Sequence, residues 1–280
     1  MRRIAFIGLW AMLLTADANA GGKIRVFVSI LPQAGLVERI GGERVEVSVL
    51  VRPGGSPATY SPTPRQLAEL SKAKLFVRVG VPFEEGFINK VRETYPKLKI
   101  VDQRDNVRLL KGVHDHVHGE SDPHIWLDPK RLVVQAQNIG KALVEEDPEN
   151  IAEYNTNMLM LIAELKALDK KIGVVMAPYK GQTLLVYHPA YGYFADSYGL
   201  KQVAVEAGGK EPGGKNLAEF IDRAREMKAK VIFVQPQFSK KSARLVAEAI
   251  GGKVVAMDPL ARDVISNLEK MARTVAGALE

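Results

Sequence analysis

Four of the five histidines in this chain of 280 residues lie in one short segment, HDHVHGESDPHIWLDP (residues 114–129). The fifth, His188, begins a second cluster, HPAYGYF. A neutral imidazole offers a nitrogen lone pair at physiological pH, and histidine is the commonest metal-ligating side chain. Neither a core nor a solvated surface needs so scarce a residue gathered in two places. The pattern therefore indicates a metal site.

The candidates differ in strength. His114, His116 and His118 form an HxHxH run that equally fits a plain polar loop, whereas a metal-binding role is favoured for His124 and His188. The chain has no cysteine, which excludes disulfides and thiolate metal sites. Any bound metal must therefore be held by nitrogen and oxygen atoms.

Residues 1–20 have the layout of a secretory signal peptide. Arg2 and Arg3 precede an apolar run over residues 4–16, and residues 18–20 end in an A-x-A pattern. The run is too short to span a bilayer comfortably, so we expect cleavage rather than a retained membrane anchor. No cysteine follows the run to carry a lipid. We expect the mature chain in the periplasm.

The formal net charge is +7, but the basic residues are spread along the chain and often stand beside acidic ones. A nucleic-acid-binding surface would need a basic stripe interleaved with aromatic residues, and the sequence has none. We therefore expect no nucleic-acid partner.

Short apolar strands alternate with helical stretches in both halves of the chain. The strands are expected at residues 24–30, 45–51, 74–79, 98–101, 184–187, 202–205, 231–234 and 254–257. Such alternation is typical of parallel sheets covered by helices. The sequence thus predicts an α/β fold of two lobes, each with a mostly parallel four-stranded sheet and flanking helices.

One longer helix is expected between the two halves. Apolar residues recur at steps of three and four from Ile151 to Ile172, and no proline follows until Pro178. A helix of about 25 residues is long enough to join two lobes. We expect an N-terminal lobe at residues 21–147, a linking helix at 148–177 and a C-terminal lobe at 178–280.

The strongest ligand candidates follow expected strands, where open α/β sheets place their binding sites. His188 follows the strand 184–187, Asp258 follows the strand 254–257, and the histidine segment follows the strand ending near residue 101. An aspartate before proline frequently forms a turn, so the residue type alone is weak evidence for a metal ligand. Asp258 is a candidate because it follows an expected strand. Two imidazoles and a carboxylate suit Zn²⁺, whereas Mn²⁺ prefers more oxygen ligands.

Several motifs resemble those of the ZnuA/TroA-type metal-binding proteins, the solute receptors of zinc and manganese ABC importers. They are PGGSPATYSPTPRQLAELSKAKLFVRVG, DPHIWLDP, HPAYGYFADSYGL and VVAMDPLA, and the resemblance extends over essentially the whole mature chain. The resemblance implies two lobes joined by one long helix, a metal ion in the cleft and little lobe closure. It also implies an inner-membrane ABC permease as partner, and we expect a monomer.

The resemblance carries the family's second, third and fourth ligands onto His124, His188 and Asp258. A histidine at 188 resembles the zinc-selective branch, and His114, His116 and His118 resemble a short form of the family's histidine-rich loop. The first ligand does not carry over, because this sequence has Ala58 where the family has histidine.

Three consequences of Ala58 are open: water fills the fourth position, a loop histidine supplies it, or tight binding has been lost. We favour the first two.

Three classes of function compete. The leading hypothesis is a binding protein, not an enzyme, that captures Zn²⁺ as transported ligand and delivers it to the permease, with Mn²⁺ or another divalent metal as the alternative. A zinc hydrolase also keeps an open metal position, and Glu84, Glu85 and Glu211 are its candidate bases, although none stands in a motif such as H-E-x-x-H. A surface adhesin is the third class, and the missing lipid-anchoring cysteine disfavours it.

Overall fold

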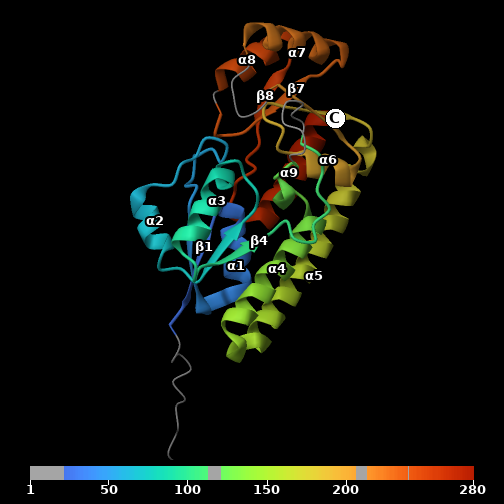
Figure 1. Ribbon diagram of the computed structural model, residues 1–280. Helices are drawn as coiled ribbons and strands as arrows, with labels where there is room; N and C mark the ends of the chain where they lie inside the picture. The colour runs from blue at the N-terminus through green and yellow to red at the C-terminus, as the bar shows by residue number, and fades with distance from the viewer. Residues whose placement is uncertain (1–21, 113–120, 206–212, 239) are drawn as a thin grey trace, which may run out of the picture.

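The structure, a computed structural model, describes residues 22–112, 121–205, 213–238 and 240–280 (Figure 1). The expected signal peptide, the loop histidines His114, His116 and His118, and the candidate base Glu211 lie outside these residues.

The N-terminal sheet has four parallel strands in the order β2-β1-β3-β4 within the described part of the chain. The strands are β1 (Ile24–Val28), β2 (Val45–Val49), β3 (Leu75–Arg78) and β4 (Lys99–Asp102). They are connected through α1 (Leu31–Gly41), the 3-10 turn η1 (Gly42–Arg44), α2 (Pro64–Leu70) and α3 (Phe83–Thr94). The central strands β1 and β3 are almost entirely buried, as strands in the middle of a parallel sheet should be.

The C-terminal sheet repeats this plan with the order β6-β5-β7-β8, again parallel throughout the described residues. Its strands are β5 (Thr183–Val186), β6 (Lys201–Ala204), β7 (Val231–Val234) and β8 (Lys253–Ala256). Its helices are α6 (Gly192–Tyr198), α7 (Gly214–Glu226) and α8 (Lys240–Ala249). The two sheets are thus built from the same β-α repeat.

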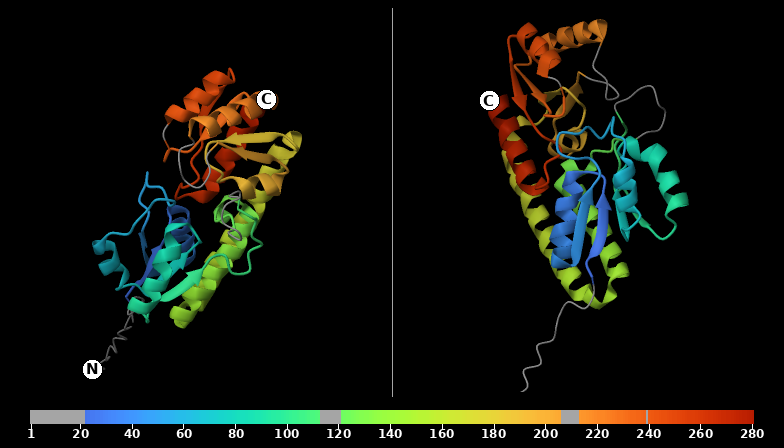
Figure 2. Two further views of the ribbon diagram at one scale, coloured as in Figure 1. Left: turned by 45° about the horizontal axis from the view of Figure 1, so that its top comes forward. Right: turned by 90° about the vertical axis from the view of Figure 1, so that its left-hand side faces the viewer.

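Three helices run beside or between the sheets (Figure 2): α4 (Pro129–Glu146), α5 (Ile151–Met176) and α9 (Val264–Leu279). Short 3-10 turns η2 (Ile125–Leu127), η3 (Pro148–Asn150) and η4 (Ala177–Tyr179) precede or follow them. The 26 residues of α5 span about 39 Å at about 1.5 Å per residue. Helices α4, α1 and α9 all pack against α5, so the C-terminal end of the chain returns to the helix that follows the N-terminal lobe.

The lobes share one hydrophobic core rather than two separate ones. A single cluster of buried residues includes Val28 of β1, Leu165 of α5, Val186 of β5 and Leu268 of α9. Separate clusters cover only the outer face of each sheet. Continuous burial of apolar surface opposes separation of the lobes, because opening them would expose that surface to water.

The expected fold class is confirmed, and the differences lie at element ends. Strand β1 ends at Val28 rather than residue 30, because the side-chain oxygen of Gln33 accepts the backbone N–H groups of Ser29 and Ile30, at 3.0 Å each. Helix α4 begins at Pro129, because the Asp128 side chain caps its first turn. Within the described ranges, no helix has the length and apolar character that crossing a membrane requires.

Candidate metal centre

His124 is held by a carboxylate two residues before it. It lies directly before η2, and Asp122 Oδ1 accepts its backbone N–H at 2.9 Å and contacts its ring Nδ1 at 2.6 Å. An ionised carboxylate only accepts hydrogen bonds, so in the neutral imidazole Nδ1 carries the proton and Nε2 keeps its lone pair. The Asp122 side chain is 5% exposed and that of His124 14%. A buried carboxylate thus fixes the ring orientation and the tautomer that metal binding requires.

His188 is held by contacts to its backbone and to the face of its ring. It lies two residues beyond the end of β5. The fully buried Gln235, which follows β7, donates from Nε2 to the His188 carbonyl at 2.9 Å and accepts the His188 N–H at 3.4 Å. The Phe238 ring stacks on the imidazole at 5.0 Å between centroids. Residues following β7 therefore position the residue that follows β5.

The structure brings the two expected imidazoles together. Nε2 of His124 and Nε2 of His188 are 3.3 Å apart, although the residues are 64 positions apart in the sequence. Because Nδ1 of His124 faces Asp122, the nitrogen that faces His188 is the one with a lone pair. The pair can therefore chelate one cation.

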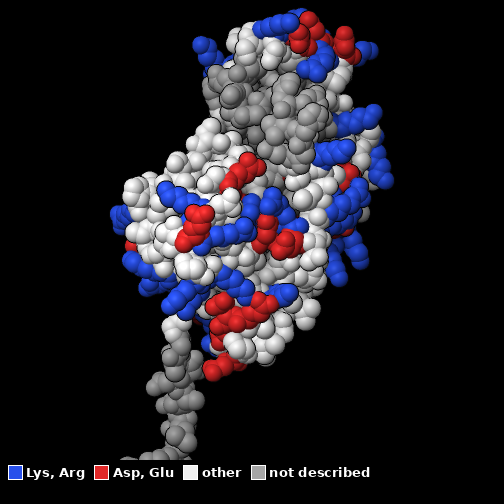
Figure 3. All heavy atoms as spheres, in the orientation of Figure 1, with Lys and Arg blue, Asp and Glu red and all other residues white. Residues whose placement is uncertain are grey.

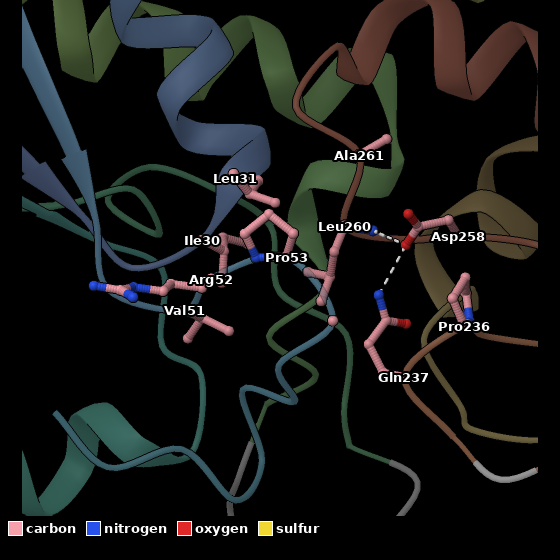
Figure 4. A pocket seen from close by; sticks show the side chains of 11 residues that line it. Ile30, Leu31, Val51, Arg52, Pro53, Pro236, Gln237, Asp258, Leu260 and Ala261 are labelled. Carbon is pink, nitrogen blue, oxygen red and sulfur yellow. Dashed lines mark hydrogen bonds between the residues drawn. The ribbon is translucent and has the colours of Figure 1, made fainter. Parts of the chain in front are cut away.

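Asp258 lies two residues beyond the end of β8, in the loop that leads to α9. Its Oδ1 accepts the Leu260 N–H at 2.9 Å and the Gln237 amide at 3.0 Å (Figure 4). Among the residues that the structure describes, no three His, Asp or Glu side chains are grouped closely enough to hold a metal ion. Asp258 thus does not stand with the two imidazoles in one preformed three-ligand cluster.

Asp258 borders a cavity of about 150 Å³ between the lobes. Its walls come from the segments after β1, β2, β7 and β8: Ile30, Leu31, Val51, Arg52, Pro53, Gly54, Pro236, Gln237, Asp258, Leu260 and Ala261. The Arg52 side chain points away from the cavity (Figure 4). The carboxyl ends of both sheets therefore meet at this cleft, which is where open α/β sheets place their binding sites.

Other expected residues have different surroundings. Ala58 is half-buried in the loop between β2 and α2. Glu84 is fully buried and accepts hydrogen bonds from Arg78 and the backbone of Val79 and Gly80, so its carboxylate is engaged in holding a turn. Glu85 is exposed on α3.

Sequence reasoning missed the residues that hold the ligands. Asp122 had a signal, since an acidic residue two positions before a histidine can orient it, and Gln235 follows an expected strand. The buried tyrosines 191 and 193 were visible only as part of a motif. Burial, and then the nearby Asp258 carboxylate, raise the pKa of Tyr191 well above its ordinary value. Burial raises the pKa of Tyr193 to about 12, so both phenols remain hydrogen-bond donors.

Comparisons with known proteins identify the family. The model of the ZnuA family, described as "Zinc-uptake complex component A periplasmic", matches residues 26–278. The chain is 27% identical over 283 residues to the zinc-binding protein AdcA of Streptococcus pyogenes serotype M3 (strain MGAS315), covering 93% of this chain but 55% of AdcA. It thus spans about half the length of that relative.

Two further relatives match over nearly their full length. A putative metal-binding protein of Chlamydia trachomatis serovar D is 28% identical, covering 98% of this chain and 99% of that protein. A crystal structure of ZnuA superposes on this chain with a TM-score of 0.86 at 38% identity, covering 92% of this chain and all of the other. The match of the family model over nearly all of the described residues shows that this chain belongs to the ZnuA family of zinc-uptake periplasmic components.

Proposed function

We propose that this chain is an extracytoplasmic receptor that binds Zn²⁺ in the cleft between its lobes and delivers it to an ABC permease. The observation that carries the proposal is the imidazole pair, with Nε2 of His124 and Nε2 of His188 separated by 3.3 Å. Two nitrogens bound to one tetrahedral zinc ion at about 2.0–2.1 Å lie about 3.3–3.4 Å apart. The spacing of the pair therefore suits zinc.

Asp258 is the proposed third ligand. Its carboxylate borders the interlobe cavity, and both of its side-chain hydrogen bonds described above use Oδ1. A carboxylate reduces the net charge of a divalent ion bound by two neutral imidazoles. Water or one of His114, His116 and His118 completes the tetrahedron in place of the histidine that Ala58 has replaced.

Zinc is favoured over manganese by the ligand atoms. Two nitrogen ligands and one oxygen ligand are typical of Zn²⁺, whereas Mn²⁺ sites are richer in oxygen. The alternative, a receptor for Mn²⁺ or another divalent metal, predicts that such an ion competes with zinc at comparable concentrations.

The partners follow from the same proposal. A cleaved signal peptide at residues 1–20 exports the chain, and the mature monomer meets an inner-membrane ABC permease. On the face shown in Figure 3, acidic side chains of the N-terminal lobe lie among the basic ones. This mixture does not favour a nucleic-acid partner, which would need a basic surface.

Calorimetric zinc titration of the metal-stripped mature protein tests the proposal. We expect one tight zinc equivalent, a large loss of affinity in His124→Ala and His188→Ala, and a smaller loss in Asp258→Asn. Asp263→Asn is the matched control in the same loop, because asparagine can still cap α9. No saturable binding, or full affinity in both histidine variants, would contradict the proposal.

The same samples distinguish a receptor from an enzyme. Members of the family are solute-binding proteins, and a receptor needs no general base at its metal. We therefore expect no zinc-dependent ester or peptide hydrolysis. Turnover that requires His188 would overturn the receptor proposal in favour of a zinc hydrolase.

A further inference from the structure

Three buried aromatic side chains tie the candidate ligand segments to one another. We call these the His124 segment (residues 122–126), the His188 segment (188–193) and the Asp258 segment (257–260). Tyr193 donates its hydroxyl to the Asp122 carbonyl at 2.6 Å. Tyr191 donates its hydroxyl to the Met257 carbonyl at 2.6 Å. Trp126 donates its indole N–H to the Pro259 carbonyl at 2.7 Å.

These bonds form a closed arrangement. The first joins the His188 and His124 segments, the second joins the His188 and Asp258 segments, and the third joins the His124 and Asp258 segments. Each segment is therefore bonded to both of the others. Moving any one segment away breaks two of the three bonds, so the bonds oppose changes in the backbone spacing of the segments.

The acceptors are backbone carbonyls close to the candidate ligands. Asp122 orients His124, and Met257 and Pro259 flank Asp258 on both sides. Each donor side chain is at most 1% exposed, so water cannot replace a lost bond without rearrangement.

The segments are also packed without spare room. A Cβ atom at Gly192, between the two tyrosines, would lie 2.7 Å from Asp122 Oδ2. The Tyr193 hydroxyl additionally accepts the Leu110 N–H at 3.0 Å, and the Arg131 guanidinium lies 4.4 Å from the centre of its ring. Contacts therefore fix both the hydroxyl and the ring face of Tyr193.

We propose that Trp126, Tyr191 and Tyr193 form a positioning frame that fixes the backbone spacing of the three ligand segments before the metal arrives, so that only side chains have to move when the ion binds. The inference rests on the proposed metal-receptor function. A rigid frame stabilises the bound state because little ordering has to accompany binding. It would partly offset the ligand missing at Ala58. None of the three side chains contacts the ion; each acts through the carbonyl it holds.

Phenylalanine substitutions test the frame. Tyr191→Phe and Tyr193→Phe each remove one hydroxyl and keep the ring, and Trp126→Phe removes the indole N–H. Tyr154→Phe is the matched control, because Tyr154 is equally buried but donates to Asp147 at 2.7 Å, near the start of α5. Tyr198→Phe is a second control, since the Tyr198 hydroxyl of α6 donates to Asp169 of α5 at 3.1 Å.

Zinc affinity is measured together with the visible absorption spectrum of the Co²⁺-substituted protein, which reports ligand geometry independently of stability. Loss of an outer contact that orients ligands typically lowers metal affinity by about 10–100-fold. We expect a loss in that range and an altered Co²⁺ spectrum in the frame variants. The controls should lower the melting temperature but keep both the affinity and the spectrum of the unmodified protein. Frame variants that behave like the controls would overturn the inference.

A second measurement needs no variant. Amide hydrogen exchange of the metal-free protein should already show protection in the His188 and Asp258 segments, with little gain on adding zinc. Protection that develops only with zinc would also overturn the frame. If the unmodified protein binds no zinc, the proposed function fails; if it binds zinc but the variants are indistinguishable from it, only the frame fails.

Discussion

Asp122 and His124 are joined by both backbone and side chain: Oδ1 of Asp122 accepts the His124 N–H at 2.9 Å and lies 2.6 Å from ring Nδ1. The opposite ring nitrogen, Nε2, faces Nε2 of His188 at 3.3 Å. One carboxylate oxygen therefore determines both where the ring points and which nitrogen can bind a metal.

Removing that carboxylate should weaken zinc binding without removing a ligand. We expect Asp122→Ala to lower zinc affinity by about 10–100-fold, as is typical when a carboxylate that orients a ligating histidine is lost. Asp122→Asn keeps a carbonyl acceptor and should lose less. Competition with a chromophoric chelator measures both, and Asp222→Ala, an exposed carboxylate on α7, is the control. Unchanged affinity in Asp122→Ala would refute the orienting role.

The close contact between α1 and the loop after Asp258 gives a second prediction. A Cβ atom at Gly35 would lie 2.3 Å from the backbone oxygen of Arg262, so Gly35→Ala must displace one of the two segments. We expect a loss of about 1–3 kcal/mol in the free energy of unfolding, together with weaker zinc binding. Chemical denaturation and zinc titration measure the two effects.

Gly173→Ala is its matched control, because a Cβ there meets nothing within 4 Å and alanine favours the helix by up to about 1 kcal/mol. Equal stability of the two variants would show that the lobes accommodate the extra methyl group.

Restoring the missing histidine gives a third prediction. We expect Ala58→His to tighten zinc binding, because a third imidazole would complete a tetrahedral set. Joint replacement of His114, His116 and His118 by alanine should have a modest effect if water fills the fourth position. A collapse of affinity in that triple variant would identify a loop histidine as the fourth ligand, and no gain in Ala58→His would show that position 58 does not face the metal.

The acid stability of the N-terminal lobe gives a fourth prediction. Burial of Asp102 acts to raise its pKa, but hydrogen bonds and charge from Arg104, with a further contribution from Arg78, outweigh it and leave the pKa below its ordinary value. A lowered native pKa contributes stability above the unfolded pKa of about 3.9, and this contribution is lost as the pH falls through the native value.

Thermal melts of the metal-free protein between neutral pH and about pH 3 should show a weaker pH dependence in Asp102→Asn than in the unmodified chain. Asp105→Asn, an exposed aspartate three residues on, should leave the profile unchanged. Identical profiles for all three proteins would contradict the assignment.

Much of the fold follows from the sequence because its signals are local. Valine-rich strands bounded by glycine and proline predict the sheets, and the apolar period from Ile151 to Ile172 predicts α5. The packing of the C-terminal helix and its preceding loop against the rest of the molecule was not predictable in this way. Helix α9 packs against α5, and Gly35 contacts Arg262, through tertiary contacts that no local pattern records.

The residues of the candidate site were likewise predictable only in part. The rule that binding residues follow strands pointed to His188 and Asp258, and the scarcity of histidine pointed to His124. The partners were not predictable, because Gln235 and Trp126 act through backbone groups that lie 47 and 133 residues away along the chain. A backbone carbonyl leaves no trace in the sequence.

A crystal structure of the zinc-loaded protein, with anomalous scattering collected at the zinc absorption edge, tests the central claim most directly. We predict a single strong anomalous peak in the cleft, bonded to Nε2 of His124 and Nε2 of His188, with the Asp258 carboxylate as third ligand. A zinc ion bound elsewhere, or one that leaves the two imidazoles uncoordinated, would contradict the account.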